Sequence, residues 1–330
     1  MSSLLESRAG MRCRQLAVWA AASLWIALAA GMLGRYLWPL DLFAHFRVQY
    51  AVLFVLIAVL LWIFKRRMLS VVSLAGAVVS AVPLMAYLAP GTGPSASASS
   101  PHFRVITFNA WIASRDIRST ADFLRRADAD AIVLQELSAH EVMELRERLS
   151  SYPYWYIGPL SSRVAILSRW PIREAVPFRS GSGGIIGSRV ALDWMGQRIQ
   201  LLGVHLHWPL SGWSSRLRNE ELRSIAAWAR EQQDPVLVAG DFNITPWSAH
   251  FAELLSRSGL RDCAQGEGLR GSWPAQLPLF RIRIDHCLAS AHFRTVEVRV
   301  GPMLRSDHLP VSADLIFDAT RASDAGRSSA

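Results

Sequence analysis

Residues 236–243 read Val-Leu-Val-Ala-Gly-Asp-Phe-Asn, and this stretch decides the fold. The apolar run from Val236 to Ala239 has the length and composition of a strand that is buried on both faces. Asp241 and Asn243 follow where the apolar run stops. Polar residues at the ends of buried strands are typical of α/β proteins, which place their sites at one edge of a sheet.

The same pattern extends on both sides of this stretch and predicts an α/β domain over residues 102–318. Short apolar segments bounded by turns predict further strands at Phe103–Asn109, Ala131–Gln135, Val164–Leu167, Arg189–Asp193 and Arg198–His205. Apolar residues at helical spacing predict helices at Ile117–Ala127, Glu141–Leu149 and Trp213–Gln232. Polar residues again stand at the strand ends, as in Glu136 directly after Gln135.

Six short motifs occur in a fixed order along this domain. They are Thr-Phe-Asn at 107–109, Leu-Gln-Glu at 134–136, Gly-Val-His at 203–205, Gly-Asp-Phe-Asn at 240–243, Arg-Ile-Asp at 283–285 and Ser-Asp-His-Leu-Pro at 306–310. In this combination the sequence resembles the endonuclease/exonuclease/phosphatase family, which contains DNase I-like nucleases, sphingomyelinases and inositol-polyphosphate phosphatases. The resemblance implies a four-layer α/β sandwich of the DNase I type.

A phosphoesterase needs a cation at the phosphoryl oxygens, and this domain offers oxygen ligands for one. Asn109, Glu136 and Asp307 are hard donors that suit Mg²⁺ or Mn²⁺. Glu136 ends a buried strand, where an unpaired carboxylate would be costly. The resemblance makes Glu136 the principal metal ligand; a salt-bridged or helix-capping glutamate is the alternative.

The resemblance also implies roles for five catalytic residues. Asp285 would orient His308, which would act as a general base or stabilise phosphate charge. Asp241 would orient or deprotonate the attacking water, and Asn243 would donate a hydrogen bond to the phosphate. His205 would contact the scissile phosphate or protonate the leaving group. Satisfied polar residues in loops are the alternative for each of them.

Two other histidines are expected to play smaller parts. His207 would share a strand face with His205, but no third ligand stands at a fitting spacing, so it is secondary. His286 would point to the strand face opposite Asp285 and is expected to be structural.

Three apolar runs precede the α/β domain. They extend from Leu16 to Leu33, from Val48 to Phe64 and from Leu69 to Leu88, each long enough to cross a bilayer. They predict a membrane domain over residues 1–89 with three transmembrane helices. The first run could instead be a signal peptide, but the other two would still hold the protein in the membrane.

The basic residues predict how the chain crosses the inner (cell) membrane. Residues 1–100 contain eight basic and two acidic residues, a net of +6, whereas the rest carries only +3. The small net charge of residues 101–330 therefore does not indicate a surface that binds a long polyanion such as a nucleic acid. Arg8, Arg12 and Arg14 before the first run and the basic segment 65–67 belong on the cytoplasmic side. This places the catalytic domain in the periplasm or outside. Arg35 and Arg47, against Asp41 in the first loop, argue the other way.

The remaining segments are connecting or terminal. Pro, Gly and Ser dominate residues 90–101, which predicts a flexible linker, and residues 319–330 are expected to be a disordered tail. Cys13, Cys263 and Cys287 show no metal-binding spacing. Cys263 and Cys287 either stay separate buried thiols or form one disulfide in an oxidising compartment.

Together these patterns predict a membrane-anchored, metal-dependent hydrolase of a phosphodiester or phosphomonoester. A non-catalytic phosphoester-binding domain on the same anchor is the alternative. Within the enzyme class the substrate could be a lipid, a nucleic acid or another envelope phosphoester. The membrane tether and the near-neutral domain favour a lipid, while Trp208, Trp213, Trp247 and Trp273 in loops suit either a lipid or a nucleic acid.

Overall fold

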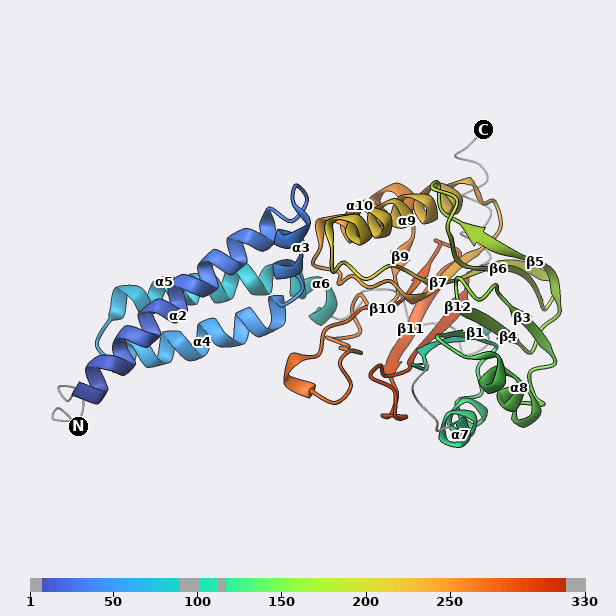
Figure 1. Ribbon diagram of the computed structural model, residues 1–330, viewed down its shortest axis with the longest axis horizontal. Coiled ribbons are helices and arrows are strands. Elements are labelled where there is room, and N and C mark those ends of the chain that lie inside the picture. Colours follow the sequence, from blue (N-terminus) through green and yellow to red (C-terminus); the bar gives the residue numbers. More distant parts are fainter. Residues whose placement is uncertain (1–7, 90–100, 112–116, 319–330) are drawn as a thin grey trace.

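The computed structural model of the chain describes residues 8–89, 101–111 and 117–318. A bundle of long helices forms one end of the molecule and a layered α/β domain forms the other (Figure 1). Most of the predicted linker and all of the predicted tail lie outside the described residues.

The helical end contains elements long and apolar enough to cross a membrane. Its helices are α2 (Arg8–Met32), α3 (Trp38–Ala44), α4 (Arg47–Ile63), α5 (Arg67–Ala81) and α6 (Met85–Leu88), with the 3₁₀ turn η1 (Val82–Leu84) before α6. Two spans, Arg8–Met32 and Arg67–Leu88, meet the criteria of length and composition. The pair α3 and α4, bent by 63°, makes a third only if the two cross as one span. The predicted number of three is therefore reached only with this bent pair.

Helix α3 was not predicted, because its seven residues fall in the presumed loop between the first two apolar runs. Pro39 lies in its first turn, where a missing backbone N–H is harmless. The helix turns the chain sharply at the end of the bundle that faces the α/β domain (Figure 1).

The α/β domain contains two six-stranded sheets. The first has the order β11-β12-β1-β2-β4-β3, with β1 at His102–Asn109, β2 at Ala131–Gln135, β3 at Tyr154–Ile157, β4 at Val164–Ser168, β11 at Phe293–Val300 and β12 at Val311–Phe317. The second has the order β5-β6-β7-β8-β10-β9, with β5 at Ile172–Arg179, β6 at Ile185–Trp194, β7 at Gln197–His205, β8 at Val236–Asp241, β9 at Arg261–Asp262 and β10 at Asp285–Ala289.

Helices cover the outer face of each sheet, so the domain has four layers (Figure 1). Helices α7 (Ile117–Ala127) and α8 (Ala139–Arg148) share an apolar core with the first sheet, and α9 (Gly212–Glu231) and α10 (Ala249–Ser258) share one with the second. A third core lies between the sheets and includes Val105, Val133, Leu201 and Leu237. The residues adjacent to these four in the same strands face the helices instead. Both faces of each sheet are therefore buried, which is why the strand sequences are continuous apolar runs.

The predicted α/β class is thus confirmed, and several element bounds agree closely. Helix α7 and strand β2 have the predicted limits, and the other predicted elements differ by one to four residues at an end. Strands β3, β5, β9, β11 and β12 were not predicted, and β10 was implied only by the strand faces expected for Asp285 and His286. Helix α8 begins two residues early because Ser138 caps it in a capping box with Glu141.

A buried ion pair fastens the helical end to the α/β domain. Arg218 on α9 donates to Asp41 on α3 at 2.7 Å, and the two side chains are 1% and 3% exposed. Ser248 donates to the second Asp41 oxygen at 2.6 Å. His45, just after α3, shares a 2.9 Å hydrogen bond with Thr245. The contacts of α3 therefore converge on α9 and on the loop that follows β8.

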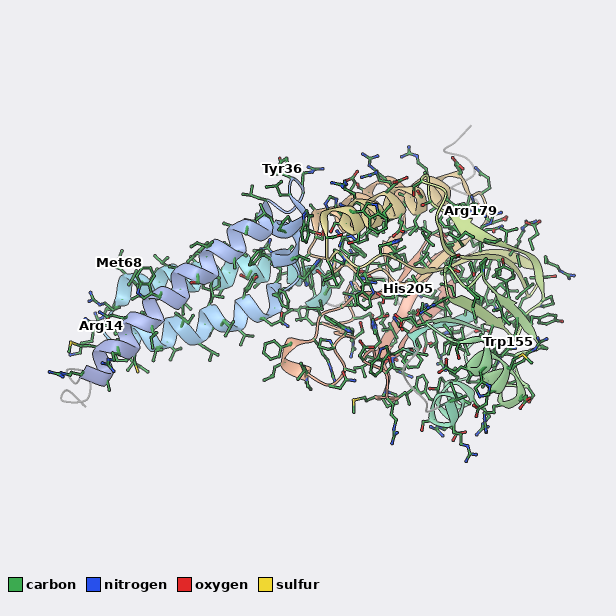
Figure 2. The ribbon with its side chains drawn as sticks, in the orientation of Figure 1. Arg14, Tyr36, Met68, Trp155, Arg179 and His205 are labelled. Carbon is green, nitrogen blue, oxygen red and sulfur yellow. The ribbon has the colours of Figure 1, made fainter. Side chains whose placement is uncertain are left out.

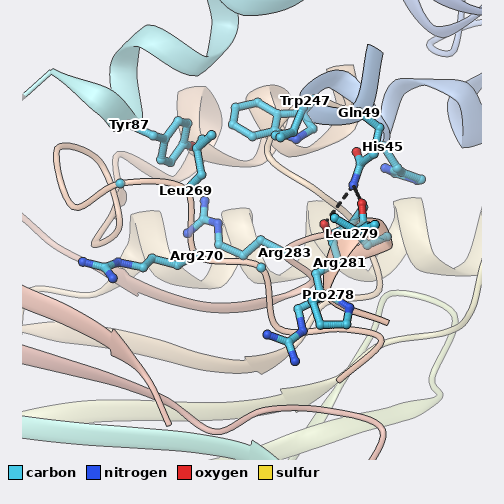
Figure 3. A pocket seen from close by; sticks show the side chains of 14 residues that line it. His45, Gln49, Tyr87, Trp247, Leu269, Arg270, Pro278, Leu279, Arg281 and Arg283 are labelled. Atoms are coloured by element: carbon cyan, nitrogen blue, oxygen red, sulfur yellow. Dashed lines mark hydrogen bonds between the residues drawn. The ribbon is translucent and has the colours of Figure 1, made fainter. Parts of the chain in front are cut away.

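A second set of contacts surrounds a cavity of about 300 Å³ at the same junction. Figure 3 shows Gln49 of α4 reaching the loop around the 3₁₀ turn η2 (Pro278–Phe280), where it donates to the carbonyl oxygens of Leu279 and Arg281. Across the cavity, the hydroxyl of Tyr87 on α6 donates to buried Asp262 at 2.9 Å. The η2 loop is thus tied directly to a helix of the bundle.

We expect the Asp41–Arg218 pair to be a major determinant of docking. Asp41→Asn would leave a buried guanidinium uncompensated, at a cost of about 3–5 kcal/mol. Replacing both residues by leucine should recover part of that loss, which thermal unfolding in detergent micelles would measure. Arg257→Leu, which removes an exposed pair with Glu253, is the matched control and should cost less than about 1 kcal/mol. A loss of stability in the double variant equal to the sum of the losses in the two single variants would contradict the expectation.

Candidate active site

Strand ends from both sheets collect the polar residues at one edge of the sandwich. β1 and β2 run parallel and end at Asn109 and Gln135, and β7 and β8 run parallel and end at His205 and Asp241. β10 runs antiparallel to β8, so its first residue, Asp285, pairs with Asp241. The carboxyl ends of parallel strands are the expected place for a site in an α/β protein.

The backbone is strained where this edge is formed. Glu136 and Asn243 have positive φ angles of 61° and 50°, a region that side-chain-bearing residues rarely adopt. Gly240 has φ of 157°, and a Cβ at that position would lie 2.0 Å from the carbonyl oxygen of Val204. The glycine therefore lets β8 run close to β7 just before Asp241.

Asn109 lies between two carboxylates. Its amide nitrogen donates to Glu136 Oε1 at 3.0 Å and to Asp241 Oδ2 at 3.1 Å. Its oxygen accepts from the backbone N–H of Trp111 at 3.1 Å. In this arrangement Asn109 bridges the carboxylates, and a flip of the amide would turn its oxygen towards them as a metal ligand.

His308 is held between two other carboxylates. Its Nδ1 lies 2.9 Å from Asp285 Oδ2, and its Nε2 lies 3.6 Å from Asp241 Oδ2. Burial, the largest single influence, lowers the pKa of His308, but Asp285 and Asp241 outweigh it and raise the pKa to about 10. The imidazole is therefore charged at neutral pH. Ser272 donates to Asp285 Oδ2 at 2.6 Å and fixes the carboxylate from behind.

Asp241 is the fully buried centre of the group. Burial raises the pKa of this carboxyl to about 6, although charged His308 opposes the shift. His205 Nε2 lies 3.5 Å from Glu136 Oε1 and 3.9 Å from Asp241 Oδ2, and it is buried without a hydrogen-bond partner. That nitrogen is available for a group that enters the site.

Asn243 and Asp307 stand at the rim of the site. Asn243 donates its backbone N–H to Asp241 at 2.9 Å and its side-chain amide to the carbonyl oxygen of Leu206 at 2.8 Å. Asp307 accepts from the indole of Trp273 at 3.0 Å. Asn243, Asp307, Glu136 and His308 all line one hollow of about 360 Å³.

The donor set fits a hard divalent cation. When ionised, Glu136, Asp241 and Asp285 carry three negative charges at one buried edge, against one positive charge on His308. A divalent ion would neutralise the remaining two charges, and carboxylate and amide oxygens are its preferred ligands. Asp285 Oδ1, buried without a hydrogen-bond partner, also indicates a site that is incomplete on its own.

Asp241, Asp285 and His308 have ligand atoms within 4.8 Å of one another, and as a group they could also hold a metal ion. That set differs from the predicted ligands Asn109, Glu136 and Asp307. Within that group, Nδ1 of His308 is already engaged by Asp285 Oδ2, which leaves only Nε2 for a metal. The oxygens that face the hollow, above all those of Glu136, are the better candidates.

The residues expected to be peripheral lie apart from this cluster. His207 lies beyond the end of β7 and contacts Glu221 on α9 through Nδ1 at 2.5 Å. His286 is buried, shares a hydrogen bond with the carbonyl oxygen of Ile244 and packs against Phe251. Cys263 and Cys287 are buried free thiols whose sulfurs lie 3.6 Å apart, so they are adjacent but not joined.

Sequence reasoning missed residues that support the site from behind. Ser306 accepts from the backbone N–H of His308 and donates to the carbonyl oxygen of Asn109 at 2.7 Å, and so joins two motifs. Its position next to Asp307 was a usable signal. Ser272 and α3 had none: Ser272 lies in an irregular loop, and α3 contacts residues far away in the sequence.

Comparisons with known proteins identify the family of this domain. A model of the endonuclease/exonuclease/phosphatase family matches residues 106–308. Over 230 residues the chain is 31% identical to the uncharacterised protein YbhP of Escherichia coli, covering 59% of this chain and 86% of that protein.

Solved structures share the fold at lower identity. An endonuclease/exonuclease/phosphatase family protein from Bacteroides thetaiotaomicron superposes with a TM-score of 0.59 at 19% identity, covering 67% of this chain and 99% of that one. D. rerio TDP2, solved with a single-strand DNA product, gives a TM-score of 0.57 at 20% identity, covering 65% and 98%. At these identities the likeness concerns the fold.

A divalent ion should stabilise the folded protein, because it binds the native carboxylates and not the unfolded chain. Mg²⁺ at about 100 times its dissociation constant should add about 2.7 kcal/mol, seen as a rise in unfolding temperature. Glu136→Gln should raise the Mg²⁺ concentration needed for half of that effect. Glu144→Gln, in a partly exposed ion pair with Arg148 on α8, is the matched control and should behave as wild type. An unfolding temperature that does not change with Mg²⁺ concentration would count against the metal site.

Proposed function

The chain belongs to the endonuclease/exonuclease/phosphatase family, and from that premise we propose that it is a membrane-anchored hydrolase that cleaves a phosphoester with the help of Mg²⁺ or Mn²⁺. The observation that carries the proposal is the cluster of Glu136, Asp241, Asp285 and His308 at the edge shared by the two sheets. Such a cluster offers a cation site, a base and a charged donor at one edge of the two sheets.

In the proposed site, Glu136 and Asp307 hold the divalent ion, with Asn109 as a third ligand once its amide is flipped. When bound, the ion supplies positive charge at the phosphoryl oxygens and lowers the barrier to attack. Glu136 is supported by its place at the end of β2 and by its exposure to the hollow.

The chain's own residues would then carry the protons. Asp241 takes a proton from the attacking water, whose oxygen forms the new bond to phosphorus while the bond to the leaving oxygen breaks. His205 gives a proton to that leaving oxygen. Charged His308 stabilises the negative charge that gathers on the phosphoryl group, and Asp285 positions the imidazole. Asn243, at the rim, donates a hydrogen bond to the phosphate.

A non-catalytic binding domain is less well supported. Such a domain would need a cavity for phosphate but neither a buried carboxylate with a raised pKa nor an oriented imidazole. Asp241 has the first property and His308 the second.

The direction of the helices supports an extracytoplasmic catalytic domain. The N-terminal end of α2 and the connection between α4 and α5 lie at the end of the bundle far from the α/β domain (Figure 1). Arg14 and Met68 mark that end in Figure 2. Both places carry basic residues, which favour the cytoplasmic side. With three passes, the α/β domain lies on the opposite face of the membrane.

The proposed division of labour predicts coupled losses of turnover. His308→Ala should lower turnover by about 10²-fold or more. Because Asp285 acts through His308, Asp285→Asn combined with His308→Ala should be little worse than His308→Ala alone. The measurement is a double-mutant cycle on 4-nitrophenyl phosphate and bis(4-nitrophenyl) phosphate at saturating Mg²⁺. Independent, multiplying losses would refute the pairing, as would normal turnover in His308→Ala.

The proposed orientation predicts the outcome of reporter fusions. A reporter that works only after export should be active when fused after residue 318, and one that works only in the cytoplasm should be inactive there. A fusion within the connection between α4 and α5 should give the reverse result and serves as the control. Cytoplasmic activity at residue 318 would overturn the orientation.

A further inference from the structure

Residues of both the α/β domain and the helical bundle line the hollow above the candidate active site. Its polar floor comes from the α/β domain and includes Glu136, Asp307 and His308. Leu42 of α3 and Phe46, between α3 and α4, form part of its wall. The helices of the bundle therefore do more than tether the domain, because they complete the site.

The bundle's share of the wall is fixed in place. Asp41 precedes Leu42 and is held by Arg218, and His45 precedes Phe46 and bonds Thr245. Arg218 also donates to the carbonyl oxygen of Asn243 at 3.3 Å, so one side chain contacts both α3 and the rim of the site. An ion pair and hydrogen bonds thus join the apolar wall to the polar floor.

The rest of the wall is also apolar. Trp111, Trp208 and Leu210 line the hollow, and Trp208 and Leu210 remain 56% and 70% exposed. Exposed apolar side chains gathered in one place mark a surface that binds a lipid or an apolar partner.

The position of this surface relative to the helices indicates what it meets. Leu279, 85% exposed, and Phe280 project from the η2 loop, which Gln49 ties to α4. In Figure 1 this loop extends from the α/β domain on the side of the helical bundle. If α4 crosses the membrane as proposed, the apolar loop tied to its first turn lies at the level of the membrane surface.

We propose that the substrate is a membrane amphiphile, whose phosphoester group enters the polar floor while its apolar part lies against Leu42, Phe46, Trp208 and Leu210. This inference rests on the proposed phosphoesterase function and adds the class of substrate. The hollow of about 360 Å³ is at the small end of ligand pockets, so it accepts the phosphoester and a short length of chain. The remainder of the amphiphile stays in the bilayer.

The test varies chain length at constant phosphate chemistry. Full-length protein in nanodiscs of dioleoylphosphatidylcholine is titrated with butyl, hexyl and octyl phosphate in the presence of Mg²⁺. Binding is followed by tryptophan fluorescence, and inhibition by cleavage of 4-nitrophenyl phosphate and bis(4-nitrophenyl) phosphate. Affinity should rise with each added methylene, up to about fourfold per group.

Three variants separate the pocket from simple partition into the nanodisc. Leu210→Ser and Phe46→Ser should flatten the dependence on chain length. Met143→Ser, a 56% exposed apolar residue on α8, should keep the wild-type dependence. Because Leu210 is mostly exposed, its replacement is not expected to disturb folding. The same slope in all four proteins would overturn the proposal.

The outcomes for substrate class and for activity can be told apart. If the nitrophenyl esters are cleaved but affinity does not depend on alkyl chain length, the amphiphile proposal is overturned. Competition by oligothymidylate would then assign the hollow to a nucleic acid. A chain-length dependence that Leu210→Ser and Phe46→Ser abolish supports the amphiphile site. If that dependence is seen without cleavage of either ester, the proposed hydrolase fails while the binding site stands.

Discussion

The concentration of negative charge at the shared edge of the two sheets is the constraint on which the site depends. Glu136, Asp241 and Asp285 reach one buried place because β2, β8 and β10 end or begin there. Carboxylates so close together would repel one another and resist burial. The surroundings compensate with the charge of His308 and the amide of Asn109. The charge that remains is what makes a divalent cation fit.

Sequence reasoning succeeded where the signal is local. The six residues 131–136 predict a buried strand followed by a polar Glu136. The structure has strand β2 at these residues, with Glu136 at its end beside His205. The grouping of Asn109, Glu136, His205, Asp241, Asp285 and His308 followed from motif order and the family resemblance. Their detailed contacts could not follow, such as the amide nitrogen of Asn109 facing the carboxylates.

The features that escaped prediction depend on contacts between distant parts of the chain. Helix α3 is short and lies between two stronger apolar signals, and its partners Arg218 and Thr245 are about two hundred residues away. Ser272 bonds Asp285 through a loop with no regular period. Such residues look like ordinary surface polar groups in the sequence, and only the tertiary structure shows that they are buried.

The Asp41–Arg218 pair also has a consequence for biosynthesis. Asp41 precedes its partner by 177 residues. At about 5–20 residues per second, the ribosome needs roughly 9–35 s to cover that distance. During that interval α4 and α5 are completed, while the Asp41 carboxylate still lacks its guanidinium partner. Helix α3 therefore docks on the α/β domain only after α9 has been made, whereas the apolar core of the bundle itself, with Leu28, Phe54 and Ala77, is complete much earlier.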